Sequence, residues 1–167
     1  MKHWKAGLFT LAAGALLGIA LSVPGSAKAV KGEIPPDFTG TTLDGRKVSL
    51  SDFRGKNPVV LNFFAEFCGP CRKEFPHLRA LDEKFGPKGL RVVAVSLDED
   101  RAAAGAIPRE SGAKFPIVFD PKGSIAARYG VQAIPHTVVV DRDGKVNAVL
   151  IGLDNESLDR AVGQVMK

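Results

Sequence analysis

Residues 59–76 read VVLNFFAEFCGPCRKEFP, and this stretch decides the fold. A nearly unbroken apolar run, residues 58–64, contains the β-branched and aromatic residues typical of a strand buried in the middle of a sheet. A helix is predicted to begin between Cys68 and Pro70, because proline is tolerated in a first helical turn and apolar residues then recur at helical spacing. Pro76 lies inside this predicted helix and should kink it.

Strands and helices alternate through the rest of the chain. The predicted strands cover residues 47–50, 90–97, 115–119, 137–141 and 145–151, and the predicted helices cover 51–54, 99–111, 124–129 and a last helix from Asn155, its expected N-cap. Gly105 and Pro108 are expected to interrupt the helix over 99–111. A βαβ half followed by a ββα half predicts an α/β sandwich with a mixed sheet.

Cys68 and Cys71 are the only cysteines of the sequence. A disulfide between them would close a very short loop, which constrains an unfolded chain little, so the pair is poorly placed to stabilise a fold. A structural zinc site needs four ligands, and no second cysteine pair exists. The pair is therefore interpreted as a centre for reversible thiol–disulfide chemistry.

The two cysteines are expected to have unequal roles. Cys68 falls where the buried strand ends and the helix begins, so free backbone N–H groups and the helix dipole should stabilise its thiolate. Cys71 lies one turn deeper. The sequence thus predicts Cys68 as an exposed nucleophile and Cys71 as the buried resolving thiol, with Gly69 and Pro70 giving a partner chain a surface of low bulk.

A second candidate feature is AIPHT, residues 133–137, just before a predicted strand. A proline at the mouth of a central strand is awkward unless it makes a turn. A cis Ile134–Pro135 bond would provide that turn and expose the Ile134 backbone to a substrate strand. The residues alone leave a cis and a trans bond both open.

The first 29 residues have the parts of a secretory signal peptide. A basic start is followed by the apolar residues 6–23 and by Ala27-Lys28-Ala29, so cleavage is expected after Ala29. The alternative is an uncleaved membrane anchor through residues 6–23. Either reading puts the domain over residues 30–167 in the periplasm or elsewhere outside the cytoplasm.

The charge of the chain argues against a nucleic-acid partner. The 167 residues carry a formal net charge of +5 from 23 basic and 18 acidic residues. Three of the basic residues and no acid lie in residues 1–29, which leaves a net charge of +2 for the rest. No run of five Lys or Arg residues occurs, so a basic binding surface is not indicated.

Residues 59–76 and YGVQAIP (residues 129–135) resemble the thioredoxin superfamily. The region from residue 33 to 167 is similar to its exported branch, the ResA/TlpA-like thiol–disulfide oxidoreductases with a redoxin or AhpC/TSA-like domain. The further matching motifs are PDFT (36–39), DGRKVSL (44–50) and VDRDG (140–144).

This resemblance implies a three-layer α/β/α sandwich with a central mixed sheet and an N-terminal β-hairpin extension. It implies that Pro135 is cis and faces the two cysteines, and that Glu66, Phe67 and Ile134 border them. It further implies protein disulfides or dithiols as substrates, such as those of cytochrome c maturation or of copper sites. A membrane thiol reductase is the implied electron donor, and no cofactor is expected.

The sequence departs from the superfamily pattern at three places. Asn62 replaces the buried aspartate of cytoplasmic thioredoxins and cannot accept a proton from Cys71. Phe64 and Phe67 stand where relatives usually carry tryptophan. The acidic residue that some haem-maturation members place between the cysteines is absent, which weakens a role specific to cytochrome c.

Two other functions remain open on the sequence. A Sco-like copper chaperone would use Cys68, Cys71 and His136, because thiolates and imidazole suit copper, although that family spaces its cysteines one residue further apart. Without a metal, His136 would be an ordinary surface loop histidine. A peroxiredoxin would need a hydroxyl residue three positions before the reactive cysteine, where this chain has Ala65.

Overall fold

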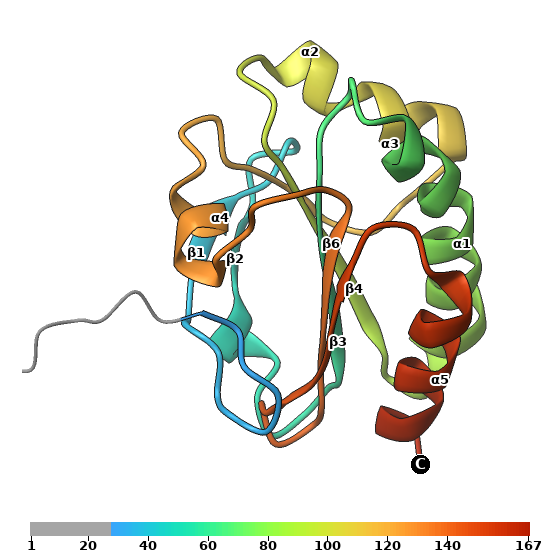
Figure 1. The fold of residues 1–167 in the computed structure, drawn as a ribbon. Helices are drawn as coiled ribbons and strands as arrows, with labels where there is room; N and C mark the ends of the chain where they lie inside the picture. Colours follow the sequence, from blue (N-terminus) through green and yellow to red (C-terminus); the bar gives the residue numbers. More distant parts are fainter. Residues whose placement is uncertain (1–27) are drawn as a thin grey trace, which may run out of the picture.

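The computed structural model describes residues 28–167, and the predicted signal segment lies almost wholly outside them (Figure 1). A five-stranded sheet has the order β5-β4-β3-β6-β7, in which β3, β4 and β5 pair in parallel, β6 runs antiparallel to β3, and β7 runs antiparallel to β6. Its strands are β3 (Val59–Phe64), β4 (Arg91–Ser96), β5 (Ile117–Phe119), β6 (His136–Val140) and β7 (Val146–Ile151). A separate hairpin pairs β1 (Thr39–Thr41) with β2 (Lys47–Ser49). The predicted mixed sheet and the hairpin extension are confirmed.

Helices cover both faces of the sheet, which gives three layers (Figure 1). One face carries α1, α3 and α5, and the other carries α4 together with the hairpin. The helices are α1 (Gly69–Phe85), α2 (Arg101–Ala104), α3 (Ala106–Ser111), α4 (Ser124–Tyr129) and α5 (Asn155–Val165), with 3-10 turns η1 (Leu50–Asp52) and η2 (Gly86–Lys88). Within residues 28–167, no helix combines the length and apolar character needed to cross a membrane.

The central strand β3 is buried on both faces, which explains its unbroken apolar sequence. Val60 and Phe64 point into the core under α1, while Leu61 and Phe63 point into the core under α4. Asn62 alternates with these residues and therefore faces α1, where it is the only polar side chain of the strand.

Two local details differ from the sequence predictions. The helix over residues 99–111 is divided at Gly105, but Pro108 lies inside α3, in its first turn, where a missing N–H is tolerated. The N-cap of α5 is Asp154, whose carboxylate accepts a hydrogen bond from the Ser157 N–H at 2.9 Å. Asn155 is the first helical residue and not the cap, so that prediction was wrong.

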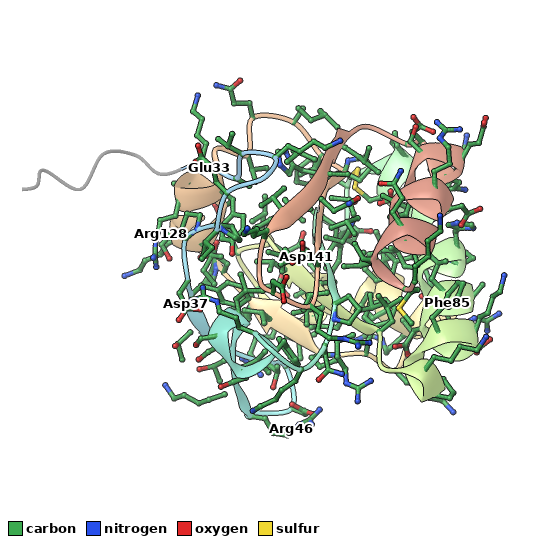
Figure 2. The ribbon with its side chains drawn as sticks, turned by 90° about the horizontal axis from the view of Figure 1, so that it is seen from below. Glu33, Asp37, Arg46, Phe85, Arg128 and Asp141 are labelled. Carbon is green, nitrogen blue, oxygen red and sulfur yellow. A yellow bond between two sulfur atoms is a disulfide. The ribbon has the colours of Figure 1, made fainter. Side chains whose placement is uncertain are left out.

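The N-terminal extension protects both edges of the sheet. On the β5 edge, the Leu43 N–H donates to Ile117 O at 2.8 Å. On the β7 edge, Gly32 and Glu33 exchange backbone hydrogen bonds with Val146 at 2.8 and 2.9 Å. Figure 2 shows Glu33 on the same side of the molecule as α4, whereas Phe85 at the end of α1 lies on the opposite side. The extension thus shields edges that would otherwise offer unpaired backbone groups to other chains.

Candidate active site

Cys68 and Cys71 form a disulfide at the N-terminus of α1. Their Cα atoms are 5.3 Å apart, and the Cys71 N–H donates to the Cys68 sulfur at 3.1 Å. Cys68 is the N-cap of this 17-residue helix, so its sulfur lies where helix N–H groups are unpaired. Because that position favours an anion, Cys68 is the better placed of the two to become a thiolate on reduction.

The expectation that Cys68 is exposed was wrong. Its side chain is 6% exposed, while Cys71 is fully buried. Both belong to the core under α1, and the half-buried side chain of Ile134 packs against that core. A partner disulfide can therefore reach Cys68 only over the small accessible area of this residue.

Exposed apolar residues flank Cys68 on both sides in the sequence. Phe67 directly precedes Cys68 and is 80% exposed, and Gly69 and Pro70 follow as exposed residues. A large aromatic ring in water beside a nearly buried disulfide is suited to contact with another protein.

The Ile134–Pro135 bond is cis, which confirms the expectation from the family resemblance. Pro135 is buried, and its carbonyl accepts a hydrogen bond from the Gly152 N–H at 2.8 Å. Gly152 lies between Ile151 and Leu153, which are 65% and 42% exposed. The bond therefore places two exposed apolar residues next to the loop that contains Pro135. The sequence analysis did not single out these two residues, although the predicted hairpin of residues 137–141 and 145–151 ends at Ile151, opposite the start of the strand that follows Pro135.

Glu74 is a buried carboxyl that the sequence interpretation also missed. It is 1% exposed and lies on α1 one turn after Cys71, on the same buried face. The Asn62 Nδ2 donates to Glu74 Oε2 at 2.7 Å and to Thr137 Oγ1 at 2.8 Å. Helix α1 and strands β3 and β6 thus bring three polar side chains together inside an apolar core.

The protonation of Glu74 is governed by its burial. Desolvation raises the pKa of this carboxyl to about 7, and the neighbouring polar side chains of Asn62 and Thr137 partly oppose the rise. Glu74 can therefore gain or lose a proton near neutral pH. Asn62 cannot accept a proton, as expected, but a carboxyl from the neighbouring helix lies against it. One signal in the sequence was available: an acid within the apolar stripe of the helix, where an unpaired charge is rare.

Glu66 is held in place from several sides. Its N–H donates to Asp98 Oδ1 at 2.9 Å, and Arg72 donates to its carbonyl at 3.2 Å and its carboxylate at 3.0 Å. Arg72 also pairs with Glu110 of α3. Asp98 in turn accepts a hydrogen bond from Ser96 Oγ at 2.8 Å. These bonds hold Glu66 in the loop between β3 and α1, two residues before Cys68.

His136 does not join the cysteines. It is 3% exposed, and its ring lies 5.9 Å from that of Phe63, centroid to centroid, in the core under α4. Successive strand residues face opposite sides of a sheet, so Thr137 faces α1 and His136 faces away from it. Burial lowers the pKa of His136. Neither the surface-loop interpretation nor a copper site of Cys68, Cys71 and His136 fits this geometry, and residues 28–167 contain no cluster of three His, Cys, Asp or Glu side chains placed to hold a metal.

Comparison with known proteins agrees with this arrangement. A sequence model of the AhpC/TSA family matches residues 32–149. The chain is 39% identical over 115 residues to the thiol–disulfide oxidoreductase ResA of Bacillus thuringiensis subsp. konkukian, a match that covers 69% of this chain and 66% of the relative.

Two solved structures share the fold along nearly their whole length. A candidate thiol:disulfide interchange protein DsbE from Chlorobium tepidum is 36% identical with a TM-score of 0.78, covering 84% of this chain and 100% of that one. A secreted disulfide oxidoreductase of Mycobacterium tuberculosis, described as homologous to E. coli DsbE, is 27% identical with a TM-score of 0.67, covering 76% and 95%. The chain therefore belongs to the AhpC/TSA family, among its thiol–disulfide oxidoreductases of the ResA type.

Proposed function

We propose that this protein reduces disulfides in particular partner proteins outside the cytoplasm. The observation that carries the proposal is the Cys68–Cys71 disulfide at the N-terminus of α1, nearly buried yet beside the exposed ring of Phe67. A disulfide that served only stability would need no exposed aromatic neighbour. The position at the helix N-terminus favours the thiolate form of Cys68, which is the form that attacks disulfides.

The exchange takes place in two steps. The Cys68 thiolate attacks one sulfur of the partner disulfide, which forms a mixed disulfide and releases the other partner sulfur as a thiolate. Cys71 then attacks the Cys68 sulfur, so that the Cys68–Cys71 bond forms and the second partner sulfur leaves. The Cys71 thiol loses its proton in this step. Glu74, one helical turn away and ionised at neutral pH in part of the molecules, takes up that proton.

Export and re-reduction complete the proposal. Residues 1–29 act as a cleaved signal peptide, or residues 6–23 as a membrane anchor, and residues 30–167 form the working domain in the periplasm. The secreted relative from Mycobacterium tuberculosis supports this location. An exported dithiol needs an electron source, so a membrane thiol reductase would return Cys68 and Cys71 to the reduced state. Cysteines of cytochrome c maturation or of copper sites are the proposed targets.

Disulfide reduction by single-cysteine variants tests this function. Cys68→Ser should abolish reduction of insulin, whereas Cys71→Ser should accumulate mixed disulfides with the partner. The reduction potential of the couple should lie near the thioredoxin value of about −270 mV. Normal turnover by Cys68→Ser would overturn the proposal. A potential near about −120 mV would instead make the protein an oxidant of its partners.

A further inference from the structure

His136 is a buried titratable side chain that the proposed reaction does not use. It begins β6 directly after the cis Ile134–Pro135 bond and is 3% exposed. Both of its ring nitrogens are buried, and neither has a hydrogen-bond partner within residues 28–167. A neutral imidazole has one N–H donor and one acceptor nitrogen, so this burial leaves both polar functions of the ring unpaired. Such unpaired buried groups are uncommon in proteins.

The neighbours of the His136 ring are apolar. The ring lies nearly perpendicular to that of Phe63, its partner in the register of β3 with β6, at 5.9 Å between centroids. Phe63 in turn packs against Tyr129 of α4 at 5.3 Å. On β7, the residue opposite His136 is Ile151. An imidazolium ion in this place would have lost its hydration without gaining a hydrogen bond or a counter-charge.

None of the charged groups around this part of the core compensates for the burial. The titratable side chains placed there are Tyr129 and Arg128 of α4, Asp120 before it, and Lys28 and Asp37 of the N-terminal segment. The Tyr129 hydroxyl donates to a backbone carbonyl of the N-terminal segment, and the Asp120 carboxylate accepts backbone N–H groups of α4. Burial is the single cause that lowers the pKa of His136, so none of these groups stabilises its charged form.

The position of His136 couples its charge to the cis-proline loop. Ile134, two residues earlier, packs against both cores, including the one that contains the two cysteines. Pro135 is joined to the end of β7, because its carbonyl accepts the Gly152 N–H at 2.8 Å. If the His136 ring leaves the core to reach water, the start of β6 must move, and both contacts move with it.

We propose that His136 is an acid-sensitive switch beside the active site: its neutral ring holds the start of β6 and the cis-proline loop in place, and its protonation opens them. The inference rests on the proposed function, because a protein outside the cytoplasm is exposed to the pH of its surroundings. The step is a proton transfer from solvent to the imidazole, which then exchanges its aromatic neighbours for water. An unpaired buried charge is what drives the ring out of the core.

Acid should make this opening easier. The ordinary histidine pKa is 6.5, and burial lowers that of His136, so below about pH 6.5 the open form binds a proton that the closed form lacks. The equilibrium therefore shifts toward the open form as the pH falls through this window. Glu74 acts in the opposite direction, because its raised pKa gives the folded protein an additional proton in acid. Comparing variants of His136 at the same pH removes the contribution of Glu74.

Amide hydrogen exchange at Gly152 measures the opening, because its N–H is bonded to Pro135. Relative to the intrinsic exchange rate at each pH, protection of this amide should fall about tenfold between pH 7 and pH 5 in the wild type. It should stay constant over this range in His136→Phe. His136→Thr should also show no acid-dependent loss, even where its smaller side chain lowers protection at both pH values.

Two controls define the outcome. The Leu43 amide, bonded to Ile117 at the other edge of the sheet, should keep its protection in all variants. His77→Gln removes a partly buried histidine of α1 that pairs with Asp159, and it should keep the acid-dependent loss at Gly152.

Constant protection of Gly152 in the wild type, or an equal loss in His136→Phe, would overturn the inference. An equal fall at Leu43 would make the acid effect a general loss of stability and would overturn it too. Failure of the wild-type protein to reduce any partner would contradict the proposed function but would leave the exchange measurement intact.

Discussion

At the scale of single residues, Glu74 shows how burial and hydrogen bonding compete. Leaving water raises the pKa of its carboxyl, and the neutral polar side chains beside it recover only part of that cost. An oppositely charged partner would have kept the carboxylate ionised, as in a buried ion pair. No cation lowers the pKa of Glu74 in this way, so its carboxyl can exchange a proton near pH 7.

Replacement of Glu74 by glutamine should change how stability depends on pH. The ordinary carboxyl pKa is 4.5 and the folded value is about 7, so between these values the folded protein holds a proton that the unfolded chain has lost. The free energy of unfolding should therefore fall as pH rises through this window, by about 3 kcal/mol relative to Glu74→Gln. Urea unfolding of the oxidised proteins at several pH values measures this difference.

The control for this measurement is Glu83→Gln, which removes an exposed acid from the same helix. It should follow the wild-type profile. If the free energy of unfolding depends on pH in the same way in the wild type and in Glu74→Gln, the raised pKa of Glu74 is contradicted.

Phe67 should contribute to partner binding and not to the redox couple. Its ring is 80% exposed beside Cys68, so Phe67→Ala removes contact area available only to a partner. We expect the KM for insulin to rise about tenfold, the size of an interface hot spot, with the reduction potential unchanged. Ile34→Ala removes an exposed apolar side chain from the N-terminal extension and should leave KM as it was. An unchanged KM in Phe67→Ala would remove Phe67 from the docking surface.

At the scale of secondary-structure elements, the loop from β3 to α1 leads directly to Cys68 and is held by hydrogen bonds from neighbouring elements. Asp98, just after β4, accepts the Glu66 N–H, and Arg72 of α1 holds the Glu66 carbonyl and carboxylate. The ion pairs of Arg72 are half exposed and contribute little to stability. The buried acceptor Asp98 matters more, because its loss leaves the Glu66 N–H without its partner.

The variant Asp98→Ala should loosen this loop. We expect the free energy of unfolding to fall by about 2 kcal/mol and amide hydrogen exchange at Glu66 to become faster. The control is Asp100→Ala, which removes the N-cap of α2 and should cost about 1 kcal/mol without changing exchange at Glu66. If the Glu66 amide exchanges its hydrogen at the same rate in the wild type, Asp98→Ala and Asp100→Ala, the Asp98 hydrogen bond does not hold the loop.

At the scale of the whole molecule, a short chain builds two cores on one sheet. Strands β3, β4 and β6 supply apolar residues to both faces, while the hairpin and residues 32–33 close the two edges. The N-terminal extension therefore stabilises the sheet that positions the cysteines, although it lies far from them in sequence. The proposed signal segment precedes the extension, so its removal after Ala29 would leave these edge contacts in place.

The sequence by itself determined the features that depend on neighbouring residues. Periodicity placed β3, α1 and the hairpin of β6 and β7, and the spacing of Cys68 and Cys71 located the disulfide. These inferences succeeded because strand and helix patterns, proline in a first turn and a three-residue cysteine spacing are local properties. The cis bond before Pro135 required the family resemblance, since a lone proline is compatible with either isomer.

Only the tertiary structure decided which polar side chains meet beneath the helix that carries the cysteines. Glu74, Asn62 and Thr137 come from three elements, and Asn62 and Thr137 are 75 residues apart. Their contact depends on the register of β3 with β6, and a shift of one residue would have exchanged the faces of His136 and Thr137. The same packing covers Cys68, which the sequence predicted to be exposed. Register and burial arise from the whole core, so no local pattern could show that the histidine faces away from the site and the threonine faces into it.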